Sequence, residues 1–157
     1  MRIIRLDPSF TCWDELLALI LTAFASMNGR IDPPSSALSL TAETLAAKAE
    51  AEIGHVAIEE GKLTGCLFLR PEADCLYVGK LAVLPAVQGK GLGRRLLAIA
   101  EETAAGLGLA ALRLETRIEL VENHAVFTAW GFSRTAEKAH PGFTRTTFIE
   151  MRKNLAR

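Results

Sequence analysis

The sequence has few cysteines, no net charge and no long apolar run. Its three cysteines are too few and too scattered for a disulfide framework or a zinc knuckle, so we expect a reducing compartment and no metal site. Eighteen basic residues balance eighteen acidic ones, and no net field would attract nucleic acid or an anionic membrane. The longest apolar stretch, residues 16–25, is shorter than the ~20 residues that a bilayer requires, and residues 1–8 do not resemble a secretory signal. These absences predict a cytoplasmic protein that binds neither nucleic acid nor membrane.

The composition is typical of a globular protein. Half of the 157 residues are apolar and 23% are charged, which argues against disorder and coiled coil. A chain of this size buries about 68 to 70% of its unfolded surface when it folds, which is enough for a complete hydrophobic core. We therefore expect a single domain over residues 1–157.

The apolar pattern alternates between a period of two and a helical period along the chain. It predicts strands at residues 2–7, 55–59, 63–70, 75–83, 110–116, 135–138 and 143–151, and helices at residues 13–27, 41–52, 91–107 and 122–130. Ser9 or Thr11 is the expected cap of the first helix. That helix is apolar nearly all round, which fits a core helix or, alternatively, contact with a second copy in a homodimer. The order predicts an α/β or α+β domain, a central mixed sheet with helices on both faces.

A glycine-rich segment carries the clearest chemical signal. Gly89, Gly91 and Gly93 follow a strand that ends near Pro85, and they lead directly into a helix. Glycines let the backbone turn so that several N–H groups point at one spot, beside the positive end of the helix dipole. The segment therefore predicts an anion-binding site suited to phosphate.

Basic side chains crowd the same segment. Helix N-termini normally favour Asp and Glu, yet Lys90, Arg94 and Arg95 stand here without an acidic neighbour. A bound anion would neutralise them; the alternative is a plain turn with solvated basic residues. The common nucleotide motifs do not fit, because a P-loop needs glycine at Leu84 and a hydroxyl at Gly91, and a dinucleotide motif needs a third glycine at Arg94.

The pattern Gln88-x-x-Gly91-x-Gly93, after a strand that ends at Val83, resembles the pyrophosphate-binding motif of the GNAT superfamily of N-acetyltransferases, which use acetyl-CoA. The order of predicted elements is similar to that family over nearly the whole chain, including Asn123 and a short helix that ends in Trp-Gly-Phe. The resemblance implies a mostly antiparallel GNAT-like sheet with a strand splay that binds acetyl-CoA. It also implies transfer of an acetyl group to a primary amine of a small molecule or peptide.

The resemblance assigns roles to individual residues. It implies that the pyrophosphate is held by the backbone of one continuous run, Gln88, Gly89, Lys90, Gly91, Leu92, Gly93 and Arg94. It implies that Leu81, Ala82 and Val83 line the pantetheine arm, in the gap between their strand and the strand at residues 110–116. Asn123 would contact the arm, and Phe127 would lie near the thioester sulfur.

Two positions depart from the family pattern. Many members carry a tyrosine, thought to protonate the departing thiolate, where this chain has Phe127. Some carry a glutamate as general base where this chain has Tyr77, its only tyrosine. A phenol with a pKa near ~10 is a poor base, so Tyr77 would position an amine or a water. An alternative therefore stays open, a non-catalytic acyl-CoA-binding or regulatory module of the same fold.

The loop at residues 30–36 is the expected acceptor-recognition segment, because it follows the first helix, which borders the acceptor groove in this family. Its two prolines would reduce the entropy lost on binding. Arg30 would clamp a carboxylate and Asp32 an ammonium. An ordered connection without substrate contact is the equal alternative.

Overall fold

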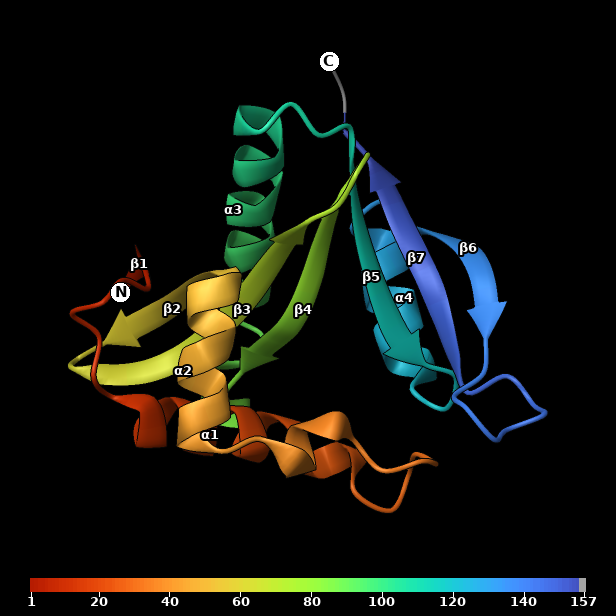
Figure 1. Ribbon diagram of the computed structural model, residues 1–157, viewed down its shortest axis with the longest axis horizontal. Helices are drawn as coiled ribbons and strands as arrows, with labels where there is room; N and C mark the ends of the chain where they lie inside the picture. The colour runs from red at the N-terminus through yellow and green to blue at the C-terminus, as the bar shows by residue number, and fades with distance from the viewer. Residues whose placement is uncertain (156–157) are drawn as a thin grey trace.

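The computed structural model describes residues 1–155, which contain a seven-stranded sheet (Figure 1). In spatial order the strands are β1 (Arg2–Arg5), β2 (Ile53–Glu59), β3 (Lys62–Pro71), β4 (Leu76–Val83), β5 (Ala111–Arg117), β7 (Phe148–Asn154) and β6 (Ser133–Lys138). β4 and β5 pair in parallel, and the other neighbouring pairs are antiparallel. The predicted mixed, mostly antiparallel sheet is confirmed.

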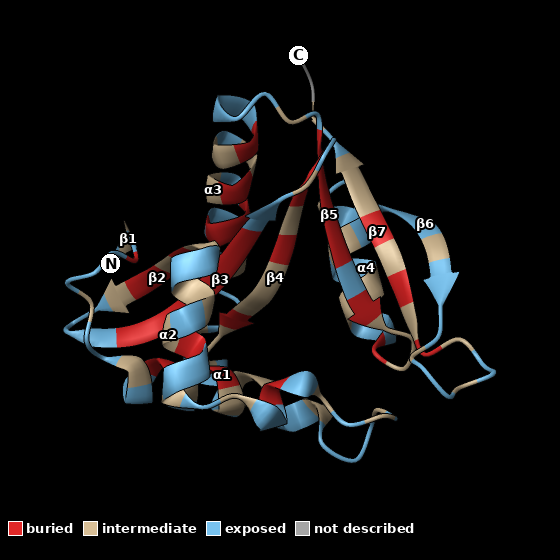
Figure 2. Cartoon of the chain, in the orientation of Figure 1, coloured by how far each residue is buried: buried red, intermediate tan, exposed pale blue. Residues whose placement is uncertain are grey.

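Helices cover both faces of this sheet. They are α1 (Trp13–Phe24), α2 (Ala42–Ala51), α3 (Leu92–Gly106) and α4 (Val121–Ala129). Successive residues of β3 enter two different cores: Leu67 packs in the cluster that contains α3, whereas Phe68 packs in the cluster that contains α1 and α2. Phe127 of α4 and Trp130, which directly follows this helix, pack against the α3 cluster. Buried residues of β3 therefore alternate between two helical layers. In Figure 2 most of β3 is red, because helices cover it on both faces.

β4 and β5 diverge soon after they meet. Their pairing is confined to Leu76 with Leu112 and Tyr77 with Arg113. The rest of β4, as far as Val83, has no strand partner on that side within residues 1–155. Figure 1 shows the two halves of the sheet joined at one end and apart at the other. The splay implied by the family resemblance is therefore present in this chain.

A bulge in β4 contributes to this divergence. The pairing register of β3 and β4 shifts between Cys66 and Phe68, so that β4 has one extra residue there. Lys80 lies in the bulge, with a φ of 48°, in the left-handed region that side-chain-bearing residues seldom adopt. The bulge bends β4 and turns its last residues away from β5.

An ion-pair cluster fastens the joined end of the two halves. Arg113 of β5 donates hydrogen bonds to both carboxylate oxygens of Glu72, at 2.8 and 3.0 Å, and to Glu115 at 3.0 Å. Because Glu72 lies in the turn between β3 and β4, these bonds cross the junction. The hydrogen bonds from Arg113 lower the pKa of the Glu72 carboxyl to about 2.

The helix boundaries agree with expectation at α2 and differ at α1. Thr41 caps α2 in a reciprocal arrangement with Thr44, whose N–H donates to Thr41 Oγ1 at 3.1 Å. The expected cap of α1 was wrong: Cys12 stands at that position without a side-chain bond, and Ser9 instead donates to Asp7. The regular helix ends at Phe24, and one turn of 3₁₀-helix completes the predicted length.

The last strand begins later than the sequence predicts. Residues 143–147 form a loop, in which the N–H of Phe143 donates to the carbonyl of His140 at 3.0 Å. The strand starts at Phe148, where pairing with both β5 and β6 begins. The loop therefore lies at the open end of the splay rather than within the sheet.

Candidate active site

The glycine loop, residues 88–94, presents unpaired backbone N–H groups at the start of α3. Gly89 and Gly91 have φ values of 80° and 83°, and Gly91 is the N-cap residue of the helix. The N–H of Arg95 bonds to the carbonyl of Gly91 at 3.0 Å, whereas those of residues 89–94 have no acceptor in the described chain. A Cβ at Gly89 or Gly91 would meet nothing within 4 Å, so the loop faces open space. This is the arrangement of an anion-binding helix N-terminus.

Three basic side chains surround these N–H groups. Lys90, Arg94 and Arg95 are exposed, and the first turn of α3 has no acidic residue. Within residues 1–155 none of the three has a carboxylate within 4 Å. Arg94 lies over the ring of Trp130, 5.7 Å from its centroid. The glycine loop is therefore a positively charged surface without an internal counter-charge.

Two residues of the loop fix it to its neighbours. Gln88 donates from Nε2 to the carbonyl of Val83 at 3.1 Å, which ties the loop to the end of β4. A Cβ at Gly93 would lie 3.3 Å from the ring of Trp130, so the close approach of that ring favours glycine. Leu92 is buried in the core beneath the loop. These contacts hold the N–H groups beside the splayed strands.

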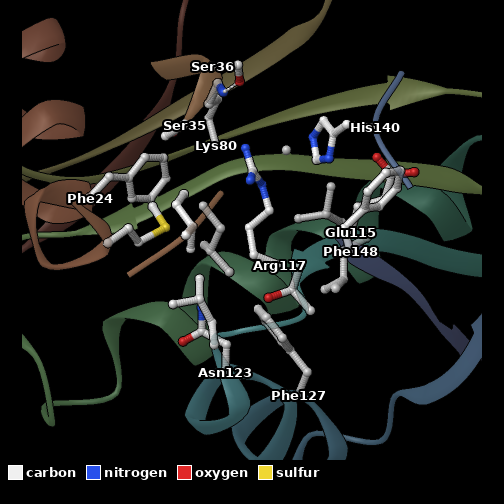
Figure 3. A pocket seen from close by; sticks show the side chains of 18 of the residues that line it. Phe24, Ser35, Ser36, Lys80, Glu115, Arg117, Asn123, Phe127, His140 and Phe148 are labelled. Carbon is white, nitrogen blue, oxygen red and sulfur yellow. Dashed lines mark hydrogen bonds between the residues drawn. The ribbon is translucent and has the colours of Figure 1, made fainter. Parts of the chain in front are cut away.

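A cavity of about 350 Å³ lies where β4 and β5 separate (Figure 3). Its lining comes from the end of α1 and the following loop, from β4 and β5, from the start of α4, and from residues near β7. Four of the site residues predicted from the sequence line it: Tyr77, Leu81, Asn123 and Phe127. The fold thus brings together residues that are far apart in the chain.

The other two residues predicted for the pantetheine arm have different surroundings. The side chain of Ala82 is buried in the core under α1 and α2. Val83 is half-buried against the α3 core, near Gly93. At Ala82, therefore, only the backbone of β4 is left to meet a molecule in the gap.

Tyr77 lies between two guanidinium groups. The centroid of its ring is 4.7 Å from Cζ of Arg70 and 4.5 Å from Cζ of Arg113. Burial, with the nearby negative charge of Glu115, raises the pKa of Tyr77. A phenol that is harder to deprotonate than usual is a still poorer base at neutral pH. Its hydroxyl is suited to orienting a group rather than to removing a proton.

Phe127 forms an apolar wall of the cavity. Its ring packs edge-on against Trp130 and Phe132, with centroids 5.9 and 5.8 Å apart. Asn123, from the preceding turn of α4, lies on the same side of the cavity (Figure 3). Of these two side chains, Asn123 can form hydrogen bonds through its amide, and neither can act as a general acid.

Arg30 and Asp32 form ion pairs with the C-terminal half of the chain. Arg30 pairs with Glu122 at 2.7 Å, and Asp32 pairs with Arg145 at 2.9 Å. Neither residue is among those that line the cavity. Their roles in acceptor binding stay predictions, and these contacts give them a part in fixing the loop.

Arg117 fastens the same loop from β5. Its two Nη atoms donate to the carbonyl oxygens of Pro33 and Pro34, at 2.5 and 3.0 Å. The loop thereby spans from α1 to the C-terminal half of the sheet. Since Ile31 and Pro34 line the cavity, the loop closes one of its sides.

Sequence reasoning missed the three basic or titratable side chains Lys80, Arg117 and His140, which line the cavity (Figure 3). Burial lowers the pKa of Lys80 below its usual range, and the charges of Lys48 and Arg117 lower it further. Lys80 interrupts a mostly apolar strand, and that interruption is the one signal in the sequence that marks it. His140 and Arg117 follow no comparable pattern.

A buried threonine sets the hydrogen position on the ring of His140. Thr147 is completely buried; its Oγ1 accepts the backbone N–H of His140 at 2.8 Å and lies 2.5 Å from Nδ1. Its hydroxyl hydrogen has no other acceptor within residues 1–155, so we assign it to Nδ1, which leaves the ring hydrogen on Nε2. Burial lowers the pKa of His140, which keeps the ring neutral near pH 7. His140 is therefore an N–H donor.

The sequence matches the model of the acetyltransferase (GNAT) family over residues 13–132. The chain belongs to this family, which confirms the resemblance seen in the sequence. A comparison with curated proteins finds none that matches.

Solved acetyltransferase structures share the fold over their whole length. The PaiA N-acetyltransferase of Thermoplasma acidophilum, in complex with coenzyme A, is 18% identical, with a TM-score of 0.78 over 99% of this chain and 100% of that one. A GNAT family acetyltransferase of Elizabethkingia anophelis with acetyl-CoA bound is 18% identical, with a TM-score of 0.69 over 98% and 97%. An IAA acetyltransferase of Bacillus cereus is 23% identical, with a TM-score of 0.68 over 98% and 99%.

Residues 1–155 bear on metal binding and on membrane insertion. No three His, Cys, Asp or Glu side chains in this part of the chain are grouped so that they could hold a metal ion. None of its helices combines the length and the apolar character that crossing a membrane requires.

Proposed function

We propose that the chain transfers the acetyl group of acetyl-CoA directly to a primary amine of a small molecule or peptide, in the cytoplasm, as a single domain over residues 1–157. One observation carries this proposal: the unpaired N–H groups of the glycine loop adjoin the gap between β4 and β5. A molecule with a diphosphate and an amide-bearing arm could bind to both: the diphosphate to the N–H groups, and the arm to the backbone of β4 in the gap. Two of the compared structures hold coenzyme A or acetyl-CoA.

The residues present fit such a molecule. The backbone of the glycine loop, with Lys90 and Arg94 beside it, would bind the diphosphate. The free edge of β4 would bond to the amides of the pantetheine arm, as an added strand does. Asn123 would contact the arm, and Phe127 would border the thioester. No metal takes part in this proposal.

The chemistry needs little from ionisable groups of the chain. Acetyl-CoA supplies an activated thioester, and holding an amine against it in the cavity supplies several kcal/mol through proximity. Backbone N–H groups near the bulge would polarise the carbonyl. Tyr77 would orient the amine. Phe127 cannot protonate the departing thiolate, but a thiol with a pKa of ~8.5 can leave without being protonated.

Cys66 and Cys75 do not take part in this proposal. Burial raises the pKa of the Cys66 thiol to about 12 and that of Cys75 to about 11. The thiolate is the nucleophilic form, and at neutral pH these two thiols hold almost none of it. Attack by the amine on the thioester therefore needs no acyl-enzyme step.

The test combines calorimetry of CoA binding with release of free thiol from acetyl-CoA across a panel of amines. We expect both acetyl-CoA and CoA to bind, and thiol release to depend on the added amine. Absence of heat with either form, on protein shown to be folded, would contradict the proposal.

A second candidate function is a non-catalytic acyl-CoA-binding or regulatory module. Two observations favour it: Phe127 has no hydroxyl to act as the general acid, and the raised pKa of Tyr77 makes that residue a still poorer general base. Tight CoA binding without thiol release for any amine would support this function over the first.

A further inference from the structure

The cavity contains two sheltered cations without a carboxylate partner. Lys80 and Arg117 are half-buried, and within residues 1–155 neither has a carboxylate within 4 Å. The other sheltered basic side chains in this range, Lys48, Arg113, Arg152 and Lys153, each form such an ion pair. Sheltering a charge without a partner is unfavourable, so these two positions are suited to an anion from outside the chain.

Both cations have unused hydrogen-bond donors. Lys80 donates from Nζ to Ser36 Oγ at 3.1 Å, which leaves two of the three ammonium donors. Arg117 uses two of the five guanidinium donors on the carbonyls of Pro33 and Pro34. The neutral hydroxyl and carbonyl partners orient both groups and do not cancel their charge.

The neighbouring side chains reinforce this positive character. Figure 3 shows the guanidinium of Arg117 between Lys80 and His140, whose Nε2–H is a further donor. Glu115 is the one acidic residue in the lining, and its carboxylate is occupied by Arg113 at 3.0 Å and Lys138 at 3.8 Å. The hydroxyl of Thr116, also in the lining, is buried without a hydrogen-bond partner in the described chain.

We infer that the cavity takes a small acceptor that carries a negatively charged group, a carboxylate or a phosphate, near its primary amine. Lys80 is the principal contact of that group, and Arg117 and His140 support it. The inference rests on the proposed function and adds a substrate class to it. Polycationic amines are disfavoured acceptors, because Lys80 and Arg117 repel them. The remaining lining includes the rings of Phe24, Phe127 and Phe148, which suit an apolar body.

Matched amines on the wild-type protein test the charge preference. Phenylalanine, phenylalanine amide and phenethylamine share one ring and differ in the negative charge, and phosphoethanolamine with ethanolamine separates phosphate from carboxylate. Calorimetry on the CoA-loaded protein and kcat/KM for thiol release should favour the anionic member of a set by at least about tenfold. An equal or reversed order, or no binding by any of these amines, would overturn the inference. Failure of CoA itself to bind would instead refute the proposed function.

Variants at Lys80 test the assigned contact. Lys80→Met keeps most of the length of the side chain and removes its charge, so we expect the preference for the anionic amine to disappear while CoA affinity stays unchanged. Lys80→Glu should reverse the order and favour a diamine such as 1,4-diaminobutane. Lys62→Met, at an exposed position where β3 begins, is the matched control and should behave as wild type. A preserved preference in Lys80→Met would refute the role of Lys80.

Discussion

The glycine loop and the cavity both gather positive charge, but in different environments. In the glycine loop Lys90, Arg94 and Arg95 are exposed, so water screens each of their charges, and several backbone N–H groups must act together with them to hold an anion. In the cavity Lys80 and Arg117 are sheltered, and each contact with an anion is stronger. The comparison indicates two different roles. The exposed loop suits the diphosphate of the coenzyme, which is the same in every reaction cycle, and the sheltered cavity suits selection among acceptors.

Gly91→Glu should abolish anion binding by the glycine loop, and we expect this change to have the largest effect. The change places a carboxylate among the N–H groups and strains a residue at a φ of 83°. We expect CoA affinity to fall by about a hundredfold or more in calorimetry, which corresponds to ~3 kcal/mol. Gly108→Glu is the matched control, since Gly108 has a φ of 73° and open space around it at the other end of α3. Unaltered affinity in Gly91→Glu would contradict the assignment.

Arg113→Met should weaken the fold that assembles the cavity and leave the glycine loop intact. Removing the guanidinium leaves Glu72 with one of its main partners gone, and we expect a loss of about 2 kcal/mol in the free energy of unfolding. Urea denaturation measures it, and Arg134→Met, at an exposed position on β6, is the control with little change. A loss as small as the control's would show that the cluster does not hold the junction.

The same cluster predicts a dependence of stability on pH. The pKa of Glu72 in the folded protein is about 2, below the value of ~4.3 in an unfolded chain. Its contribution is therefore complete above about pH 5 and is lost as the pH falls toward 2. Urea denaturation at several pH values should show that the free energy of unfolding falls less between about pH 5 and pH 2 in Arg113→Met than in the wild type.

Phe127→Tyr tests the catalytic role of the cavity, because it adds a hydroxyl to the apolar wall. We expect kcat to rise by up to about tenfold, because protonation helps a thiol leave but is not essential for one with a pKa of ~8.5. Steady-state thiol release measures the effect, and CoA affinity should be unchanged. A lower kcat in a fully folded variant would count against the placement of Phe127 beside the thioester.

Arg145→Gln should have the smallest effect. It removes the ion pair with the exposed Asp32 at 2.9 Å and the longer one with the half-buried Glu119 at 3.8 Å. Exposed pairs contribute little, so we expect less than about 0.5 kcal/mol in stability. The looser loop should raise the acceptor KM about twofold and leave CoA affinity unchanged. A changed CoA affinity would show that the loop acts on both regions.

Local signals in the sequence predicted the helices, most strand positions and the glycine loop. The roles of Gly89 and Gly91 could be predicted because they depend on neighbours in the chain. Both residues adopt a left-handed backbone, and a helix follows directly. The splay and the roles of the residues around it came from the family resemblance. Without that resemblance, the break in pairing after Tyr77 has no mark in the sequence.

Long-range contacts explain what the sequence did not predict. Arg117 and His140 meet in the cavity because β5 and the loop before β7 converge on it, and no local pattern records that meeting. The cap of α1 failed as a prediction because the helix begins at Trp13, which puts Cys12 at the N-cap position, while Ser9 donates to Asp7 instead. The late start of β7 follows from the turn at His140, where the N–H of Phe143 donates to the carbonyl of His140 rather than across the sheet.

The free edge of β4 has a consequence for heat resistance. Within the described residues 1–155, its peptide groups after Tyr77 have no strand partner on one side, and a metabolite that fills the gap can do so only while the chain is folded. By mass action, such a metabolite at a hundred times its dissociation constant would add ~2.7 kcal/mol to the free energy of unfolding. The melting temperature of this protein would then track the supply of activated acetate in the cell, falling when that supply runs low.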